Sequence, residues 1–265
     1  MDRAIFKKEF KDIDQHIKKL RTLEGKPYID QTLLLKDINA LRKGDEGESK
    51  VSFQLRNICK PIYCFHNIKL KYGEDCLQCD FIVITKDTIY VMENKNWKGD
   101  ITFLQNGTAI RKINKCDEPM GNPYSQSKRQ ADNLKYILVN EGLIPDNIEV
   151  RPMVVIANKY SVIKYDETYP EIRSSIIYAE DLNVFMDKEF ELVREPILTA
   201  EDIKSISKFL IKNTIEEPPM VFDENKYRIS LSKNKEKLDI PEQDTQNSKT
   251  KNNKYNNNKR NQRRR

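Results

Sequence analysis

The first 43 residues alternate apolar and polar positions with the spacing of amphipathic helices. Between residues 4 and 23 the apolar side chains recur every three or four positions, with lysines between them: Phe6, Phe10, Ile13, Ile17 and Leu20. This period predicts a helix over 4–23, and a second helix is predicted over 30–42. We interpret 1–43 as a helical extension that packs on the core or on a protein partner.

A third helix is predicted from the stretch "KGDEGESKVSFQLRNI", residues 43–58. Asp45 is a suitable N-cap, and Glu48, three residues further on, completes the pattern of a capping box. Glu48 also shares a helical stripe with Val51, Leu55 and Ile58. It can therefore cap the helix, face a sheet, or do both.

Three strand-like segments, "IYCFHNIKL", "LQCDFIVIT" and "TIYVMENK", follow the third helix. They predict strands over 62–70, 77–85 and 88–95, and the short link "TKDT" between the last two predicts an antiparallel hairpin. If Lys86 and Asp87 form the turn, Asp80 lies opposite Glu93 and Gln78 lies opposite Lys95. Directly opposed side chains share a face, with Cβ atoms about 5 Å apart.

Two facing carboxylates repel each other unless a cation lies between them. Mg²⁺ or Mn²⁺ would remove the repulsion between Asp80 and Glu93, and Mg²⁺ typically binds one or two carboxylates plus water and phosphate oxygens. Lys95, two residues after Glu93 on the same face, could then orient the attacking water and offset charge on the phosphate. The alternative is a buried salt-bridge cluster without a catalytic role.

The stretch "NPYSQSKRQADNLKYILVNEG", residues 122–142, predicts a long helix with Asn122 as its cap and Pro123 in its first turn. Its apolar stripe should pack on the sheet, with Gln126 at the edge of that stripe near the helix start. Gln126 is either a site residue or a surface amide. Lys128 and Arg129 form either a solvated basic face or a contact with phosphates.

The chain is soluble in composition, with 38% hydrophobic and 33% charged residues. Its net charge of +6 comes from the last 20 residues, which hold eight Lys or Arg and no acid. We expect residues 220–265 to be a disordered basic tail, which either solubilises the chain or binds nucleic-acid phosphates. The residues expected to make that contact are Lys259, Arg260, Arg263, Arg264 and Arg265.

No apolar run approaches the roughly 20 residues of a membrane helix, and no signal peptide is recognisable, so we expect a cytoplasmic protein. The pair Cys76 and Cys79, with Cys59, Cys64 and His66 nearby, could suggest zinc. The odd spacing of the pair within a strand points the two thiols to opposite faces, which favours ordinary packed cysteines. Nucleotide-binding glycine motifs are absent, and the two histidines, His16 and His66, lie near no second ligand or nucleophile in the sequence.

The order of four motifs, "GDEGE", "QCDFIVI", "YVMENKNWKG" and "NPYSQSKRQADNLKYIL", resembles the nuclease-related domain (NERD) of the PD-(D/E)xK nuclease superfamily. The resemblance extends from Gly44 through "VVIAN" at 154–158 to "IIYAEDL" at 176–182. It implies an α/β (α+β) fold with a three-layer αβα, restriction-endonuclease-like core around a mixed sheet, over 44–190. A C-terminal helical segment would occupy 191–219.

The resemblance also assigns roles to individual residues. Asp80 would be the strand acid, Glu93 and Lys95 the (D/E)xK pair, and Glu48 the acid of the leading helix. Gln126 falls where related nucleases place a glutamine, and the backbone carbonyl of Asn94 would be a further metal ligand. The implied reaction is Mg²⁺- or Mn²⁺-assisted hydrolysis of phosphodiester bonds, with DNA as the expected substrate.

Three functions are compatible with these observations. The chain could be a metal-dependent DNA endonuclease, an inactive nucleic-acid-binding module with the same fold, or an interaction protein that uses its N-terminal helices. Metal-dependent cleavage separates the first from the second, and salt-sensitive nucleic-acid binding separates both from the third. The oligomeric state does not follow from the sequence.

Overall fold

The computed structural model describes residues 4–8, 13–73, 75–113, 116–192, 194–215 and 222–229. The five basic residues predicted to bind phosphates at the end of the chain, from Lys259 to Arg265, lie outside the described residues. The rest of the predicted tail, apart from 222–229, lies outside them too. The fold below belongs to the residues up to Arg228.

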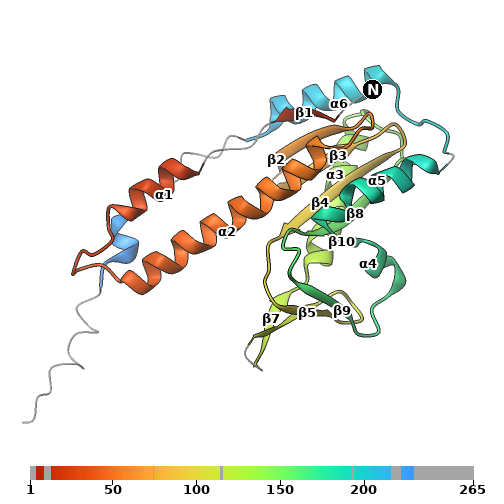
Figure 1. Cartoon of the computed structure of the whole chain (residues 1–265). Coiled ribbons are helices and arrows are strands. Elements are labelled where there is room, and N and C mark those ends of the chain that lie inside the picture. Colours follow the sequence, from red (N-terminus) through yellow and green to blue (C-terminus); the bar gives the residue numbers. More distant parts are fainter. Residues whose placement is uncertain are drawn as a thin grey trace, which may run out of the picture. The chain divides into compact units, whose positions relative to one another are not determined.

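A six-stranded mixed sheet forms the centre of the fold (Figure 1), with the strand order β1-β2-β3-β4-β8-β10. Strands β2, β3 and β4 run antiparallel to one another, whereas β1 joins β2, β8 joins β4 and β10 joins β8 in parallel. The strands span Ile5–Lys8 (β1), Tyr63–Tyr72 (β2), Asp75–Ile84 (β3), Thr88–Lys95 (β4), Glu149–Ile156 (β8) and Ile176–Tyr178 (β10).

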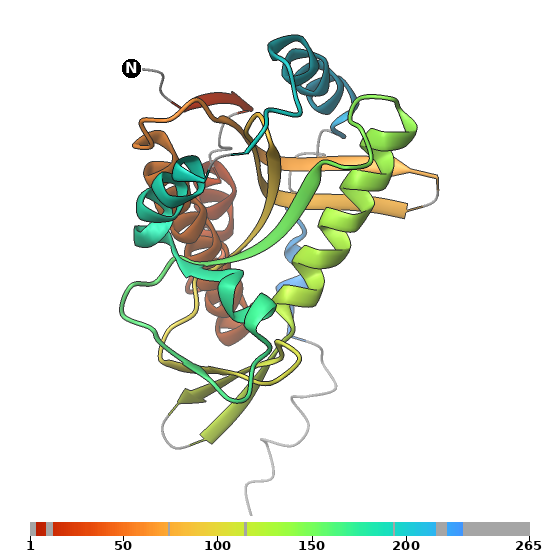
Figure 2. The ribbon, with the colours of Figure 1, turned by 90° about the vertical axis from the view of Figure 1, so that its right-hand side faces the viewer.

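Helices cover both faces of this sheet, as Figure 2 shows from the side. Helix α3 (Pro123–Asn140) and helix α6 (Ala200–Asn213) contribute Ala131, Leu134, Ile206 and Leu210 to the core on one face. Helix α2 (Gln31–Arg56) and helix α5 (Leu182–Glu191) contribute Val51, Leu55, Leu182 and Met186 to the core on the other face. The predicted αβα layering of an α/β (α+β) fold is therefore confirmed.

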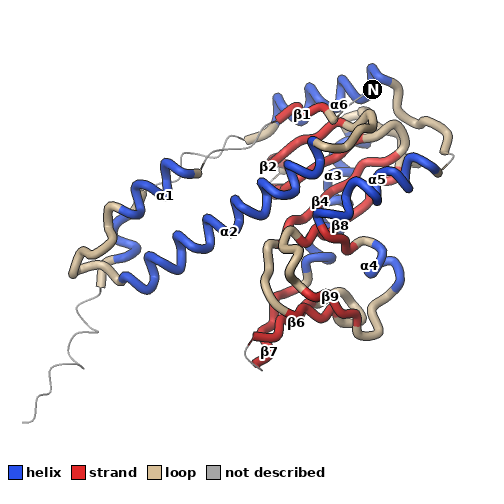
Figure 3. The backbone as a smooth tube through the Cα atoms, in the orientation of Figure 1, coloured by secondary structure: helices blue, strands red, loops and turns tan. Residues whose placement is uncertain are grey.

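A second, four-stranded sheet was not predicted. Figure 3 shows it beyond the ends of β4 and β8, with the order β7-β6-β5-β9. Its strands span Asp100–Phe103 (β5), Ala109–Ile113 (β6), Cys116–Gly121 (β7) and Val162–Tyr165 (β9), and the short helix α4 (Pro170–Ser174) follows. Ile101 and Phe103 pack with Val154 and Ile156 of the central sheet, which fixes the segment after β4 next to the segment after β8.

The predicted helix over 4–23 is wrong in its first part. Ile5–Lys8 forms the edge strand β1, and helix α1 begins only at Asp14 and ends at Arg21. The backbone N–H of Ile5 donates to the carbonyl of Ile62 at 2.9 Å. Pairing with β2 therefore outweighs the helical spacing of the apolar residues in this segment. Backbone hydrogen bonds to a partner strand stabilise the extended conformation, and a local sequence pattern does not contain information about that partner.

The second and third predicted helices are one continuous helix, α2, of 26 residues. Its N-cap is Asp30, whose side chain accepts from the N–H of Leu33 at 3.0 Å. Asp45 lies inside the helix, so its predicted role as N-cap is wrong, and the capping box that depended on it is wrong as well. The N-terminal part of α2 packs with α1 and with the 3₁₀ helix η2 (Glu224–Tyr227). These elements form a separate apolar cluster that includes Leu20 and Leu34.

The hairpin of β3 and β4 has the predicted register. Phe81 pairs with Met92 and Ile84 pairs with Ile89, around the turn at Lys86 and Asp87. The Thr85 hydroxyl organises this turn, because it accepts from the N–H of Thr88 at 3.0 Å and donates to the Asp87 carboxylate at 2.7 Å. The predicted turn and the predicted register of this hairpin are thus confirmed as far as the ladder extends.

Candidate active site

The paired part of the β3–β4 ladder ends at Phe81 and Met92, one position before the two predicted acids. Asp80 therefore does not form a strand pair with Glu93, although the register would place it there. Its carboxylate instead accepts a hydrogen bond from the backbone N–H of Asn94 at 2.8 Å. Gln78 does not pair with Lys95 either, because the β3–β4 ladder has already ended, although Gln78 still pairs with Lys69 of β2 on its other side.

The end of the ladder coincides with a change of side-chain direction in β3. Cys79 and Ile82 both belong to the core on the α3 side, although residues three apart in a regular strand point to opposite faces. The neighbouring strand β2 makes the same change at Asn67, which has a left-handed φ of 50°. This double irregularity releases Asp80 from the ladder, so that its carboxylate can point toward β4.

Three predicted site residues meet on the α3 side of β4. Glu93 is 3% exposed. The Lys95 ammonium donates to the Glu93 carboxylate at 2.5 Å and to the side-chain oxygen of Gln126 at 3.3 Å. Gln126 lies in the first turn of α3, where the Asn122 side chain accepts from the N–H of Ser125 as predicted for the cap. The sequence pattern thus identified three groups that the fold brings together.

Gln130 is a member of this cluster that the sequence reading missed. Its amide nitrogen donates to the Glu93 carboxylate at 3.0 Å and to the backbone carbonyl of Gln78 at 2.7 Å. Gln130 lies one helical turn after Gln126, so the spacing of four residues along α3 was the signal that could have revealed it. Gln130 thus binds one carboxylate oxygen of Glu93, and Lys95 binds the other.

Glu48 and His66 meet on the opposite, α2 side of the sheet. The His66 imidazole Nε2 lies 2.6 Å from a carboxylate oxygen of Glu48. This contact corrects the prediction that His66 has no neighbouring ligand, which considered only the sequence around it. Glu48 also lies close enough to Asp80 to raise the pKa of that carboxyl. Of the two uses predicted for Glu48, it faces the sheet and does not cap a helix.

Asp80 is the electrostatic centre of the cluster. Burial and the neighbouring Glu93 carboxylate raise the pKa of Asp80 to about 7, and Glu48 acts in the same direction. The Asn94 N–H and the Lys95 ammonium oppose this rise but do not cancel it. A buried carboxyl that resists ionisation next to a second carboxylate is an arrangement that a cation would relieve.

Comparison with known families decides the assignment. Residues 43–157 match the model of the nuclease-related domain, NERD. This chain contains a NERD domain. The match covers α2 from Lys43, the β3–β4 hairpin, α3 and β8, and so it includes every residue of the cluster above. No curated protein matches the chain. No solved structure matches it either.

The donor groups of this NERD domain fit a hard divalent cation. The N–H and C=O of one strand residue point to the same side, and the Asn94 N–H points to Asp80. The Asn94 carbonyl therefore points to the β3 side of β4, the side on which Asp80 lies. Two carboxylates and a carbonyl, completed by water and phosphate oxygens, are a typical Mg²⁺ environment.

Two buried side-chain oxygens beside the cluster, Oδ1 of Asn94 and Oε1 of Gln130, accept no hydrogen bond from the described residues. Buried acceptors of this kind favour a cation or an ordered water nearby. Within the described part of the chain, no group of three or more His, Cys, Asp or Glu side chains is placed to hold a metal ion. A cation beside Asp80 and Glu93 would therefore need further oxygen ligands, such as water.

Gly47 explains how α2 approaches the site so closely. A Cβ atom at this position would lie 2.7 Å from the Asn96 Cβ and 2.8 Å from the Asn94 side-chain nitrogen. Only a glycine lets the helix pass this close to the end of β4. The close approach carries Glu48, the next residue, to the edge of the sheet beside His66.

The remaining predicted residues of the NERD domain lie away from this cluster. The Lys128 ammonium forms an ion pair with Asp132 at 3.0 Å on the exposed face of α3, and Arg129 is exposed on the same helix. Cys76 is exposed whereas Cys79 is buried, as the odd spacing predicted, and burial raises the pKa of the Cys79 thiol. None of the helices described is both long and apolar enough to cross a membrane.

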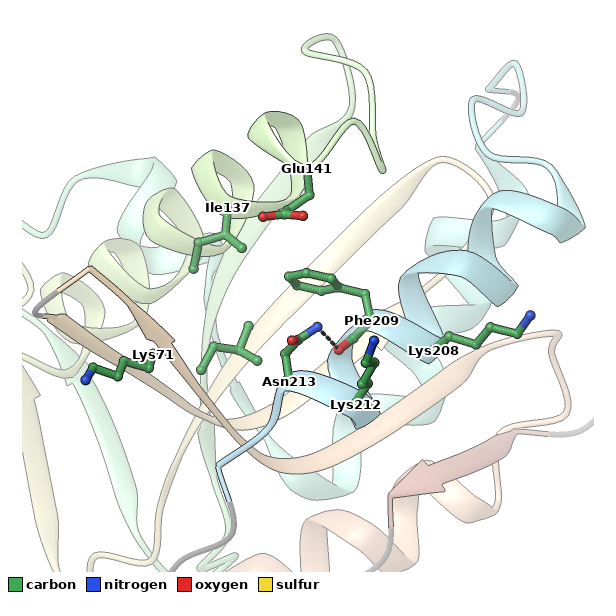
Figure 4. Close-up of a pocket in the computed structure, with 8 residues that line it drawn as sticks. Lys71, Ile137, Glu141, Lys208, Phe209, Lys212 and Asn213 are labelled. Atoms are coloured by element: carbon green, nitrogen blue, oxygen red, sulfur yellow. Dashed lines mark hydrogen bonds between the residues drawn. The ribbon is translucent and has the colours of Figure 1, made fainter.

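A surface pocket of about 410 Å³ lies at the other end of α3, between that helix, β2 and α6 (Figure 4). Its lining residues are Leu70, Lys71, Ile137, Glu141, Lys208, Phe209, Lys212 and Asn213. None of the predicted site residues belongs to it. The candidate chemistry therefore lies at the first turn of α3, and the pocket lies beside the last turn.

Proposed function

We propose that this NERD protein is a metal-dependent nuclease that hydrolyses phosphodiester bonds in DNA. The observation that carries the proposal is the gathering of the Asp80 and Glu93 carboxylates, the Lys95 ammonium and the Gln126 amide around the end of β4. Asp80, Glu93, the Asn94 carbonyl and Glu48 would hold Mg²⁺ or Mn²⁺. The bound cation would supply Lewis-acid chemistry and a water of lowered pKa.

Lys95 has two roles in this proposal. Its ammonium is held by Glu93 at 2.5 Å and by Gln126 at 3.3 Å, so it is oriented before substrate arrives. From that position it would donate a hydrogen bond to the attacking water or to a non-bridging phosphate oxygen, and so offset the negative charge that grows during the reaction. Gln126 would fix the direction of the ammonium and would not itself transfer a proton.

Nucleic-acid phosphates would also contact basic residues outside the cluster. Lys128 and Arg129, on the exposed face of α3, follow the turn that holds Gln126, and they are candidates for such contacts. The basic residues between Lys259 and Arg265 would add a sequence-independent, salt-sensitive attraction. These contacts would position the substrate, whereas the cluster at β4 would cleave it.

The test is cleavage by Lys95→Ala. We expect wild type to cut plasmid or linear DNA with Mg²⁺ or Mn²⁺ and not with EDTA. Loss of one preorganised charge at the reacting centre should lower the rate about 10²- to 10³-fold. Metal binding and folding should survive, because the ammonium is not a ligand. Lys36→Ala, an exposed lysine on α2, is the matched control and should cut like wild type.

Two outcomes would contradict the proposal. Equal cutting by wild type and Lys95→Ala would show that Lys95 is not catalytic or that a contaminating nuclease is acting. If wild type binds DNA but cuts neither duplex nor single strands with either cation, the protein is a binding module with a nuclease-like fold. Both DNA and RNA should be offered, in single-stranded and duplex form, because the cluster itself does not select among them.

A further inference from the structure

The pocket beside the last turn of α3 has an apolar floor and a charged rim. Its volume of about 410 Å³ lies in the range typical of pockets that bind small organic groups. Leu70 of β2 and Ile137 of α3 are buried and form the floor, and the partly buried Phe209 of α6 packs against the same apolar cluster. An aromatic ring that is partly open to solvent thus lies next to charged groups, which is a combination that binds nucleobases.

The rim of the pocket has more basic than acidic side chains. Three lysines line it, and none of them forms an ion pair with another described residue: Lys71, Lys208 and Lys212. Lys208 and Lys212 are one helical turn apart on α6, so their like charges repel each other. Lys204 on the same helix, by contrast, pairs with Glu201 at 3.4 Å. Three lysines against one glutamate, Glu141, leave a net charge of +2 around the pocket.

The lysines stand at the edges of the pocket and do not converge on its centre. Figure 4 shows Lys71 and Lys208 extending away from the apolar floor on opposite sides, with Glu141 on the α3 side between them. A single small anion needs donors that meet at one point. Lysines on opposite sides, with a carboxylate between them, fit a polyanion whose charges are spaced along a chain. The phosphates of a nucleic-acid strand are spaced in this way, and the base between two phosphates would lie over the apolar floor.

The pocket lies along the same side of α3 as the candidate active site. Four side chains along this helix follow one another at intervals of four, seven and four residues and so lie on one stripe: Gln126, Gln130, Ile137 and Glu141. The first two belong to the candidate active site, and the last two line the pocket. The eleven residues from Gln126 to Ile137 correspond to about 16 Å along the helix. One strand covers this distance with about five nucleotides at the spacing of B-form DNA.

We propose that this pocket binds a single strand of the DNA substrate, about five nucleotides away from the bond that is cut. Lys71, Lys208 and Lys212 bind phosphates of the strand, and one base rests on Phe209 in the apolar centre. Glu141 keeps phosphates out of that centre by repulsion. A duplex holds its bases in pairs and offers only its phosphates to the pocket. The inference rests on the proposed function for the identity of the ligand, but strand binding at the pocket needs neither metal nor cleavage.

The test is binding of fluorescent single-stranded DNA to the full chain in EDTA, measured by anisotropy over a series of salt concentrations. Lys208→Ala combined with Lys212→Ala should weaken binding. Its slope of log affinity against log salt concentration should be shallower than that of wild type by about 1.4, since each phosphate contact on a single strand contributes about 0.7. The matched control combines Lys36→Ala with Lys188→Ala, which removes the same charge from exposed positions on α2 and α5. Its slope should equal that of wild type.

Phe209→Leu tests the base contact separately. Leucine keeps the apolar floor filled but removes the ring on which a base stacks. Affinity for single-stranded DNA should fall about 5- to 100-fold, which is the contribution of stacking one base on an aromatic side chain. Affinity for a duplex of the same sequence, and for an abasic strand of the same length, should not change. Thermal unfolding of each variant checks that the fold is kept.

The possible failures are distinguishable. Equal slopes for the pocket variant and wild type would overturn the phosphate contacts. An equal loss of affinity for normal and abasic strands in Phe209→Leu would overturn the base contact. If the protein binds single strands through the pocket but never cleaves DNA, this inference stands and the proposed function is overturned. Absence of single-strand binding in wild type would overturn this inference alone if duplex DNA is still cut.

Discussion

Replacing Asp80 by asparagine should stabilise the metal-free protein and abolish metal binding at the proposed site. The two side chains have nearly the same shape, and the asparagine oxygen can still accept the hydrogen bond from the Asn94 N–H, which is 2.8 Å long in the structure. What the substitution removes is the negative charge that the fold holds next to Glu93. A residue kept for function at the expense of stability is expected to respond in this way.

The magnitude follows from the pKa of the carboxyl. Burial and Glu93 raise the pKa of Asp80 from 3.8 to about 7. A rise of about three pKa units corresponds to about 4 kcal/mol by which the ionised group lowers the free energy of unfolding. The asparagine amide must also be accommodated, which costs about 1–2 kcal/mol. We therefore expect a net gain of about 2–3 kcal/mol at pH 8.

The sign of the pH dependence follows from the same shift. Below about pH 4 Asp80 is protonated in both the folded and the unfolded chain, so it has no effect on stability. Between about pH 4 and pH 7 the unfolded chain loses this proton first, and the free energy of unfolding falls as the pH rises. Above about pH 8 the loss is complete. Asp80→Asn removes this contribution, so its advantage over wild type should be absent at pH 4 and greatest at pH 8.

The assay is urea denaturation in EDTA at pH 4.5 and pH 8, followed by thermal unfolding at pH 8 with and without Mn²⁺. Mn²⁺ should raise the unfolding temperature of wild type and leave that of Asp80→Asn unchanged. Asp132→Asn, which removes an exposed carboxylate on α3, is the control for a general change of charge. If Asp80→Asn were equally stable or less stable than wild type at pH 8 in EDTA, the two carboxylates would not repel each other and the reasoning would be refuted.

Three further predictions use other parts of the fold. Gly47→Ala should lower the free energy of unfolding by about 1–3 kcal/mol, because its Cβ would overlap Asn96. Gly44→Ala is the control, since Gly44 also lies inside α2 but has nothing within 4 Å of the new Cβ, and it should raise the free energy of unfolding by about 0.5–1 kcal/mol. Urea denaturation measures both changes, and the same sign for both would mean that α2 lies farther from β4. Glu93→Gln should lose Mn²⁺ binding in calorimetry and DNA cleavage together, and retained cleavage would remove it from the site. Deleting residues 246–265, which hold eight basic residues, should weaken the dependence of DNA affinity on salt concentration and leave the unfolding temperature unchanged. Fluorescence anisotropy measures the affinity, and an unchanged slope of log affinity against log salt concentration would exclude the tail as a phosphate contact.

Local sequence patterns determined those parts of the site that depend on neighbours in the chain. Strict alternation placed Glu93 and Lys95 on one face of β4, because successive side chains of a strand point to opposite sides. The two-residue turn at Lys86 and Asp87 set the register of the hairpin. Asn122 and Pro123 marked the start of α3, and with it the position of Gln126. Each of these features is fixed by interactions over a few residues.

The tertiary structure decided what depends on partners far along the chain. Ile5–Lys8 is a strand only because β2 offers it backbone hydrogen bonds, and α2 remains one helix through Gly44 and Gly47 because its buried side packs on the sheet. The predicted domain boundaries stay predictions. Neither local periodicity nor capping patterns contain this information, since both describe a segment in isolation.

The arrangement of the site shows the same division. The sequence by itself selected the residues of the proposed site, because pairing and alternation pointed to Asp80, Glu93 and Lys95, and the resemblance to the nuclease-related domain pointed to Gln126. Only the tertiary structure showed that the ladder ends before Asp80, that Gln130 holds Glu93, and that His66 meets Glu48 from a strand 18 residues away. The physical reason is that alternation fixes the face on which a side chain lies, whereas the end of a ladder and the approach of a helix depend on how whole layers pack.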